Sequence, residues 1–214
     1  MKTFSGSLVE WWGKNCRAFP WRFEKNLYRI LIAETFLHRT RAEAVVQFYL
    51  KFLNEFPDIK SLAKSDLRNV LAITRTLGLM QRWNFLKQAA RTIEREYSGI
   101  VPLDRKKLVR LPGIGDYIAS AIRVFGAGYG DPLIDGNTVR VVCRVNGCSI
   151  KDSTRRGKKV RTLYLTLMDK SDPSKFGYSM IDLGAKICIP HKPLCRECPV
   201  LHFCKTGNAN FDAD

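Results

Sequence analysis

Four cysteines near the end of the chain have the residue type and the spacing to bind a metal centre. The pattern C-x6-C-x2-C-x5-C is formed by Cys188, Cys195, Cys198 and Cys204. The segment around them is rich in proline and too irregular to fold by hydrophobic burial alone, so a metal centre is the expected staple. Four thiolates suit either one tetrahedral zinc ion or a cubane iron-sulfur cluster, and the spacing leaves both possibilities open.

A glycine-containing turn has the features of a phosphate-binding loop. The segment Leu111-Pro112-Gly113-Ile114-Gly115 lies between two amphipathic stretches, and its glycines permit a tight turn whose backbone amides point outward. Such amides, at the start of the following helix, can bind a phosphate oxygen without reading the base sequence. A glycine turn that serves only helix packing would look the same in the sequence.

Two acidic residues occupy positions that suggest chemistry. Glu34 lies in an otherwise apolar segment, so its carboxyl is expected to face a cleft or a buried partner. Desolvation there would raise its pKa and suit proton donation or water positioning, and a structural hydrogen bond is the alternative role. Asp135 precedes Gly136-Asn137-Thr138-Val139-Arg140, where it would make an ordinary helix N-cap.

The composition indicates a polyanionic partner. Lys and Arg number 36 against 20 Asp and Glu, giving a formal net charge of +16 over 214 residues. Nucleic acid is the expected polyanion, and a generally basic surface is the alternative. No apolar stretch approaches the roughly 18 residues that span a bilayer, and no secretory signal is recognised, so a cytoplasmic, nucleoid-associated protein without a membrane partner is expected. In that reducing compartment Cys16, Cys143 and Cys148 are expected to be small buried hydrophobic residues rather than disulfides.

The elements that must position these residues are predicted to be helices. Apolar residues recur at three- and four-residue intervals from Phe4 to about Ser179, and no period-two run interrupts them, which predicts an all-α fold. Leu8, Trp11 and Trp12 share one face of a first helix that ends ahead of Pro20. Further helices are predicted at 28–37, 41–56, 61–72, 81–97, 104–110 and 117–125, with another beginning near Asp135, and the tail from Pro190 is expected to be a loop.

Together these motifs resemble the endonuclease III superfamily of helix-hairpin-helix DNA glycosylases. The resemblance runs from Phe19-Pro20-Trp21-Arg22 to Cys204. Its anchors are the glycine turn, the four-cysteine spacing, Ile134-Asp135-Gly136-Asn137 with Arg140-Val141, and Met180-Ile181-Asp182-Leu183-Gly184. It implies a two-lobed all-α fold, with a six-helix barrel lobe at 23–130 that contains the hairpin. The other lobe is discontinuous, formed by 1–22 and 131–214, and its cysteine loop would hold a [4Fe-4S] cluster.

Two branches of the superfamily resemble the segment Ala33-Glu34-Thr35-Phe36-Leu37-His38-Arg39-Thr40. Adenine glycosylases usually carry paired glutamines where this chain has His38-Arg39, and usually continue into a domain that reads oxidised guanine; neither feature is found in this sequence. The thymine/uracil branch that acts on G mismatches has a basic residue before threonine, a Gly-Leu turn followed by arginine, as in Gly78-Leu79-Met80-Gln81-Arg82, and a tyrosine after the hairpin, here Tyr117. The resemblance is therefore closer to the mismatch-specific branch.

The resemblance assigns chemistry to three residues. Asp135 matches the catalytic aspartate, which faces the sugar and stabilises its oxocarbenium-like transition state. Glu34 matches a glutamate that is catalytic in the adenine branch. Tyr117 stands where bifunctional relatives carry a lysine whose amine attacks the sugar; a phenol cannot form that Schiff base, so water is the expected nucleophile. Tyr117 would contact the flipped nucleotide, unless it only closes the core.

The resemblance also predicts which residues contact DNA. The hairpin residues Leu111, Gly113 and Gly115 would hold phosphate. Arg39 and the Leu79-Met80 pair match two loops that, in relatives, enter the duplex and touch the orphaned guanine once the target base has left the stack. Arg82, close behind the second of these loops, is counted with them. A solvated arginine and a pair of core residues is the alternative.

These observations predict a monofunctional DNA glycosylase that starts base excision repair. It would act as a monomer on double-stranded DNA, excise thymine or uracil mispaired with guanine, and lack lyase activity. The alternatives are an adenine glycosylase acting opposite oxidised guanine and a non-catalytic iron-sulfur DNA-binding module. Asp135 and Glu34 disfavour the module, because binding an anionic backbone needs neither carboxylate, and Tyr117 disfavours a bifunctional lyase that acts on oxidised pyrimidines.

Overall fold

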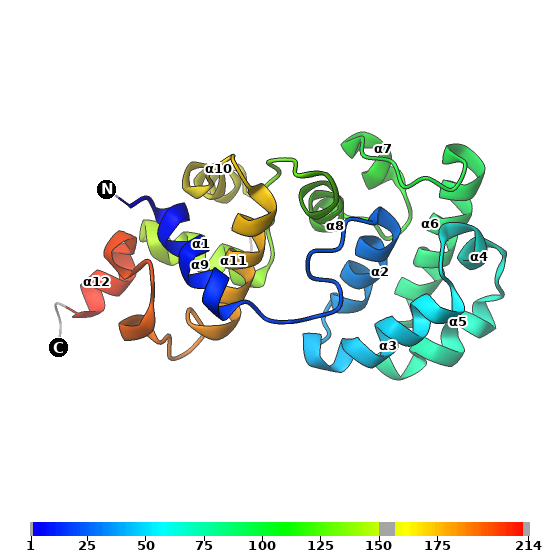
Figure 1. The fold of residues 1–214 in the computed structure, drawn as a ribbon, viewed down its shortest axis with the longest axis horizontal. Helices are drawn as coiled ribbons and strands as arrows, with labels where there is room; N and C mark the ends of the chain where they lie inside the picture. Colours follow the sequence, from blue (N-terminus) through cyan, green and yellow to red (C-terminus); the bar gives the residue numbers. More distant parts are fainter. Residues whose placement is uncertain (1, 150–156, 212–214) are drawn as a thin grey trace. The chain divides into compact units, whose positions relative to one another are not determined.

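A computed structural model describes residues 2–149 and 157–211, and every regular element in these ranges is helical (Figure 1). The predicted all-α class is therefore confirmed. The chain forms two compact units, one contiguous, Ala18–Ala127, and one made of Met1–Arg17 and Gly128–Asp214. The two predicted lobe boundaries, after residues 22 and 130, lie a few residues further along the chain than the observed boundaries, after residues 17 and 127. None of the helices described has the length and apolar character to cross a membrane.

The contiguous unit is built around helix α6. Its helices are α2 (Leu27–Leu37), α3 (Ala42–Glu55), α4 (Ile59–Lys64), α5 (Leu67–Thr74), α6 (Met80–Tyr97), α7 (Arg105–Arg110) and α8 (Asp116–Ala121), with a 3-10 turn at Arg75–Leu77 and a π-helical end at Ile122–Gly126. Helix α6 packs against α4 and α5, and α2 packs against α3 and α8. At the centre, the buried ring of Phe36 meets Phe52 and Trp83 edge-on, with ring centroids 5.2 and 4.8 Å apart.

The prediction of one helix over 61–72 was wrong, because the chain breaks there into α4 and α5. Ser65 and Asp66 both have extended backbone, with ψ angles of 162° and 148°, and Asp66 starts the new helix, a position that aspartate favours. The ammonium group of Lys87, buried on α6, donates hydrogen bonds to carbonyls at the end of α4. Lys87 therefore satisfies acceptors that a continuous helix would have paired with its own amides.

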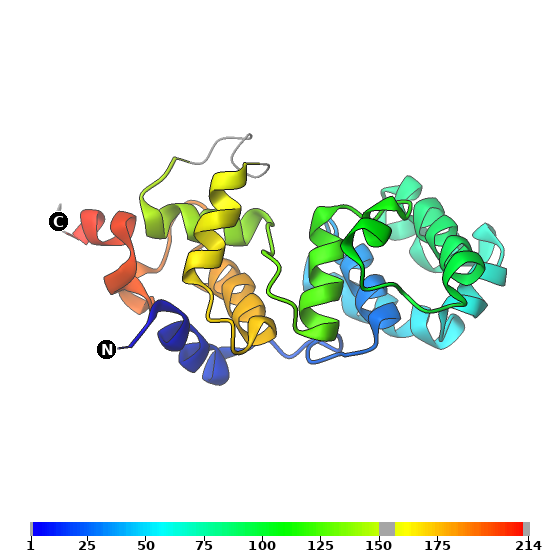
Figure 2. The ribbon, with the colours of Figure 1, turned by 90° about the horizontal axis from the view of Figure 1, so that it is seen from above.

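The discontinuous unit is organised around helix α9. Its helices are α1 (Phe4–Asn15), α9 (Gly136–Asn146), α10 (Lys158–Leu167), α11 (Pro173–Lys186) and α12 (Lys205–Phe211), with 3-10 turns at Cys195–Glu197 and Leu201–Phe203. Helix α9 packs against α10, α11 and α12, and α1 packs against α11 (Figures 1 and 2). The expectation of a loop throughout the tail was wrong for α12, which forms because it has a helix to pack against.

The buried carboxylate of Asp182 links helix α11 to the N-terminal segment of this unit. Asp182 on α11 is fully buried and accepts hydrogen bonds from the Trp12 indole (2.9 Å), the Arg17 amide (3.2 Å) and Arg17 Nε (2.7 Å). Two residues later, a Cβ atom on Gly184 would lie 2.6 Å from the Cβ of Asn137, so α11 approaches α9 closely only because position 184 is glycine. The motif Met180–Gly184 is therefore an anchor of the fold.

Two sequence expectations need correction near α1. Leu8 and Trp12 are buried as expected, but Trp11 is only partly covered, because it lies at the edge of the buried face. Cys16 is exposed, whereas Cys143 is buried and Cys148 is half-buried. Cys16 follows the last residue of α1, where the chain has left the face that packs against α11.

Candidate functional site

Asp135 lies immediately before α9, and its side chain caps that helix. The Thr138 amide donates to Asp135 Oδ1 at 2.7 Å and the Asp135 amide donates to Thr138 Oγ1 at 2.9 Å, forming a capping box. Desolvation raises the pKa of Asp135 above its ordinary value, against the opposing hydrogen bonds of Thr138 and Asn137 and the charge of Arg140. The helix N-cap that the sequence offered as the alternative to catalysis is therefore present, and the catalytic role of Asp135 stays a prediction. The same contacts fix the carboxylate, as electrostatic stabilisation of a developing charge requires.

Two arginines on α9 hold the start of the cysteine segment. Arg140 donates to the carbonyls of Gly184 and Cys188, both at 2.6 Å. Arg144 donates to the carbonyls of the two residues after Cys188, at 2.8 and 2.6 Å, and its Nη1 lies 3.4 Å from Cys188 Sγ. No role for Arg144 is predicted from the sequence; the available signal was its spacing of four residues from Arg140, which places both on one face of a helix.

The four predicted ligand cysteines lie near one another. Burial, followed by the neighbouring thiols of Cys188, Cys204 and Cys195, raises the pKa of Cys198 to about 11. The Gly207 amide donates to Cys204 Sγ at 3.3 Å. Within the described ranges, no three ligand-type side chains converge closely enough to hold a single metal ion. Four soft donors that repel one another when ionised are a donor set that fits a positively charged iron-sulfur core.

Glu34 and Tyr117 belong to the contiguous unit. Glu34 lies on α2 and is only 7% exposed, so its carboxyl is withdrawn from solvent as expected. Tyr117 lies in the first turn of α8 and is half-buried. Its ring borders a cavity, so it does not simply fill the core. The catalytic roles of both residues stay predictions.

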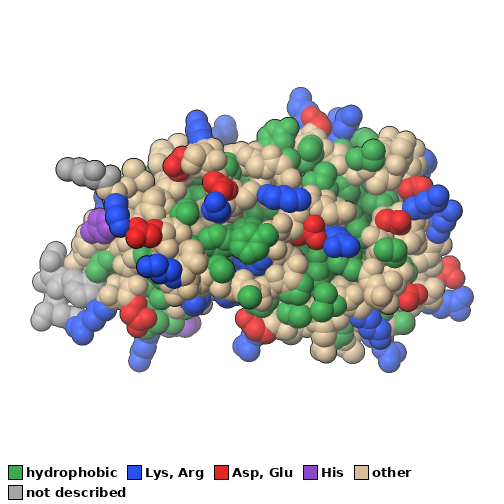
Figure 3. Space-filling model, in the orientation of Figure 1, with side chains coloured by type: hydrophobic (Ala, Val, Ile, Leu, Met, Phe, Trp, Pro, Cys, Tyr) green, Lys and Arg blue, Asp and Glu red, His purple; other side chains and the backbone are tan. Residues whose placement is uncertain are grey.

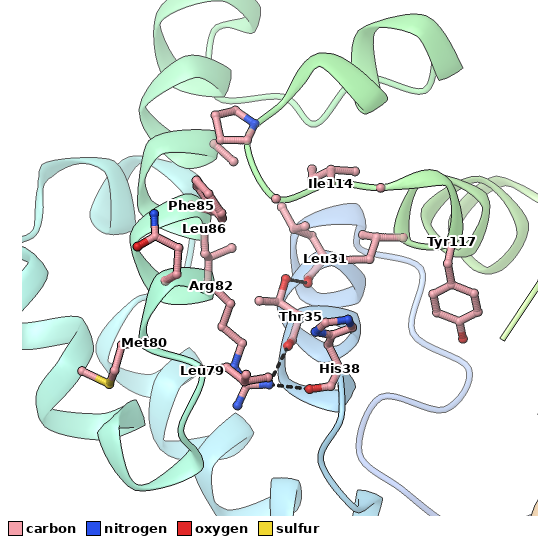
Figure 4. Close-up of a pocket in the computed structure, with 16 residues that line it drawn as sticks. Leu31, Thr35, His38, Leu79, Met80, Arg82, Phe85, Leu86, Ile114 and Tyr117 are labelled. Atoms are coloured by element: carbon pink, nitrogen blue, oxygen red, sulfur yellow. Dashed lines mark hydrogen bonds between the residues drawn. The ribbon is translucent and has the colours of Figure 1, made fainter. Parts of the chain in front are cut away.

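A cavity of about 550 Å³ lies between the end of α2, the first turns of α6, the hairpin turn and α8 (Figure 4). Its walls are largely apolar and include Leu31, His38, Leu79, Phe85, Ile114 and Tyr117. Partial desolvation and the charges of Arg39 and Arg82 lower the pKa of His38, so its imidazole is neutral at neutral pH. Such walls can accept a planar aromatic group.

The hairpin turn needs glycine at one of its two glycine positions. Gly113 has φ +76°, and a Cβ atom there would lie 2.8 Å from Phe85 Cβ, so both the backbone and the packing exclude a side chain. Gly115 is the N-cap of α8 and has ordinary extended backbone with nothing within 4 Å of an added Cβ. Leu111, in contrast, is buried and can act on DNA only through its backbone.

The two predicted wedge loops carry exposed side chains on strained backbone. Arg39 is exposed with φ +58°, and Leu79 is 43% exposed with φ +49°. Met80 is 47% exposed, so the alternative that Leu79 and Met80 are core residues is wrong. Arg82 differs from the others, because its guanidinium donates to the carbonyls of His38 (2.7 Å) and Leu77 (2.9 Å).

Comparison with known proteins places these features in a family. Residues 32–164 match the family described as "HhH-GPD superfamily base excision DNA repair protein". The chain is 36% identical to a thymine-DNA glycosylase of Aeropyrum pernix over 92% of this chain and 91% of that protein. It is 35% identical to an adenine DNA glycosylase of Buchnera aphidicola over 94% of this chain but 58% of that protein. A solved thermostable thymine-DNA glycosylase superposes with a TM-score of 0.90 at 31% identity, covering 96% of this chain and 95% of the other.

The two hairpin glycines provide a matched pair of substitutions. Gly113→Ala should lower the free energy of unfolding by about 1–3 kcal/mol, because alanine is strained at this φ and meets Phe85. Gly115→Ala should change it by less than about 0.5 kcal/mol, since its Cβ points into open space. If the turn binds phosphate, both variants should bind duplex DNA more weakly. Urea unfolding and fluorescence anisotropy measure the two effects, and wild-type DNA affinity in a stable Gly115→Ala variant would show that the turn does not hold phosphate.

Proposed function

The chain belongs to the HhH-GPD superfamily of base excision DNA repair proteins, and we propose on that premise that it is a DNA glycosylase that excises thymine or uracil mispaired with guanine. The observation that carries this proposal is the match to a thymine-DNA glycosylase over nearly the whole of both chains. The adenine alternative is weaker, because the match covers 58% of that relative. Moreover, His38-Arg39 stand where paired glutamines are usual in the adenine branch.

The proposed partner is duplex DNA, bound by a monomer. The net charge of +16 favours a polyanion, and Lys and Arg side chains are spread over the face in Figure 3 rather than gathered into one patch. Binding spread over many phosphates gives affinity without sequence preference and weakens as salt rises. Specificity for the mismatch must then come from the exposed residues that can enter the duplex, Arg39, Leu79 and Met80, and from the neighbouring cavity.

Base release is proposed to depend on Asp135. As the C1′–N bond breaks, its electron pair leaves with the pyrimidine and the sugar becomes positively charged. The ionised Asp135 stabilises that charge without reorganising, because the capping box already holds the carboxylate. The oxygen of a water molecule then bonds to C1′ and its proton passes to solvent, while the departing pyrimidine anion takes a proton from Glu34, which leaves a neutral base and an abasic site.

Glu34 and Tyr117 are proposed to act on the nucleotide and the water. Glu34 is withdrawn from solvent on α2, and its carboxyl group is the proposed proton donor to the leaving base. Tyr117 offers a phenol rather than an amine, so no imine with the sugar can form at this position and the strand stays intact. Its ring, on the wall of the cavity, is placed to contact the flipped base.

The four thiols of Cys188, Cys195, Cys198 and Cys204 are proposed to hold a [4Fe-4S] cluster. When bound, the cluster would staple the tail of the chain and take no part in bond cleavage. Arg140 and Arg144 support this role, because they already fasten the start of the segment to α9.

Asp135→Asn distinguishes catalyst from helix cap. Asparagine keeps the capping oxygen but loses the charge, so single-turnover base release from a G·T or G·U duplex should fall by about 100-fold or more while mismatch binding and stability are retained. In the wild type the rate should decrease on acidification, through a pKa above the ordinary aspartate value, because protonation removes the charge. Survival of activity in the variant would leave Asp135 with the cap role alone.

Tyr117→Lys tests whether water is the nucleophile. Wild-type protein should convert a G·T or G·U duplex to an intact strand with an abasic site that breaks only in alkali. The variant places an amine where bifunctional relatives carry theirs, so borohydride should trap a covalent protein–DNA adduct and nicking should appear without alkali. Tyr117→Phe is the control and should give neither product. Borohydride trapping by the wild type, at the rate of base release, would contradict the monofunctional assignment.

Metal analysis tests the cluster. Protein purified without oxygen should contain iron and acid-labile sulfide in equal amounts and show a broad visible absorption. Cys198→Ser should lose both and weaken DNA binding, whereas Cys16→Ser, which changes an exposed cysteine outside the set, should keep both. Stoichiometric zinc without iron would refute the cluster.

A further inference from the structure

Two turns of the contiguous unit hold non-glycine residues in left-handed backbone. In the turn Leu37–Thr40, the Thr40 amide donates to the Leu37 carbonyl at 3.2 Å, with Arg39 at φ +58°. This is the third position of a type II turn, which favours glycine. The turn of residues 75–79 places Gly78 at φ +68° and Leu79 at φ +49°. These two turns carry the exposed side chains that the proposed function assigns to the duplex wedge.

The guanidinium of Arg82 binds both turns at once. It reaches from the first turn of α6 to the end of α2 (Figure 4). Nη1 donates to the His38 carbonyl at 2.7 Å, and Nη2 donates to the Leu77 carbonyl at 2.9 Å. Both nitrogens also lie within 3.4 Å of Thr40 Oγ1.

Arg82 supplies a positive charge at the C-terminal end of α2. The last turn of α2 has no basic residue, yet its carbonyls form the negative end of the helix. Arg82 Nη1 lies 3.4 Å from two of these acceptors, the carbonyls of Thr35 and Phe36. One planar cation therefore satisfies the end of α2 and the turn that follows it.

The neighbouring Trp83 keeps this arrangement rigid. Arg82 Cζ lies 4.2 Å from the centroid of the Trp83 ring, which is fully buried. The Trp83 indole donates to the Gly78 carbonyl at 3.1 Å. Arg82 and Trp83 therefore both bind the turn of residues 75–79, and of the two only Arg82 also binds the turn Leu37–Thr40.

We propose that Arg82 is a positioning residue for base flipping: its guanidinium fixes the separation of the two turns, so that Arg39 and Leu79 enter the duplex as one wedge. This inference rests on the proposed function. The two Nη groups of its guanidinium donate to main-chain carbonyls and Thr40, and Nε is buried without a hydrogen-bond partner among the described residues, so Arg82 acts on DNA through Arg39 and Leu79 and not as a phosphate ligand.

The test compares two duplexes that differ in the cost of flipping. One holds a single G·U pair; the other holds the same pair flanked by mismatched pairs, so that the uracil is already unstacked and costs less to flip. Arg82→Lys keeps the charge but cannot span both turns. It should slow single-turnover uracil release from the first duplex by about 10- to 100-fold, as loss of a positioning contact does, and slow release from the second duplex far less. Thr40→Val, which removes only the shared hydroxyl acceptor, should shift the ratio of the two rates in the same direction by less.

Two controls separate positioning from general damage. Lys87→Met removes another buried cation of α6 that binds main-chain carbonyls, but those lie at the end of α4. It should lower stability and leave the ratio of the two rates unchanged. In an Arg39→Ala/Leu79→Ala/Met80→Ala background, Arg82→Lys should add no further loss, since none of the side chains assigned to the duplex is left to position.

Three results would overturn the inference. The first is an equal loss in the rate of uracil release from both duplexes in Arg82→Lys and Thr40→Val. The second is no loss in that rate from either duplex. The third is a full additional loss when Arg82→Lys is introduced into the background without the wedge side chains. Failure of the proposed function looks different: wild-type protein would release neither thymine nor uracil from either duplex, before any variant is compared, and the inference would fall with it.

Discussion

The hydrogen bonds along helix α9 connect the proposed catalytic carboxylate to the cysteine segment. Asp135 caps the first turn, while Arg140 and Arg144, one and two turns further, hold the carbonyls at and after Cys188. Gly184 lets α11 lie against the same helix. A shift of α9 would therefore displace the carboxylate and the cysteines together. A metal centre bound by the cysteine segment would therefore influence the position of Asp135 through helix α9, although the cysteines lie more than 50 residues further along the chain.

The exposed side chains near the cavity carry a cost in backbone conformation. Left-handed backbone at a non-glycine residue is unfavourable by roughly 1–2 kcal/mol, and both Arg39 and Leu79 adopt it. Glycine would remove the cost and also the side chain. Strain of this kind persists only where surrounding contacts over-determine the conformation, which Arg82 and Trp83 do here through the carbonyls of both turns. The protein therefore loses some folding stability at Arg39 and Leu79, the two positions where a side chain projects from a left-handed turn.

The sequence was sufficient for the helical class and for the residues whose roles depend on local pattern. Asp135 as a cap, the burial of Glu34 and the glycine at 113 follow from neighbours along the chain. Contacts between distant segments could not be read in this way. Asp182 meets Trp12, and Arg82 meets His38, through packing that no periodicity encodes. The break between α4 and α5 was missed for the same reason, because the buried Lys87 that accommodates it comes from α6. Cys16 was misjudged because residue type alone does not reveal which side of a helix end faces solvent.

The position of Asp182 relative to Trp12 also sets an order of events during synthesis. Residues 18–127 form a contiguous unit whose contacts can all be made once α8 has left the ribosome. Helix α1 is translated before this unit, yet its partner α11 follows about 160 residues later, so the apolar face of α1 stays uncovered while the unit between them folds. Each doubling of the length of a loop adds only about 0.6 kcal/mol to the entropic cost of closing it. The delay is therefore a hazard of exposure rather than of stability, and a circular permutant that begins after residue 127 and rejoins α1 behind α12 would remove it.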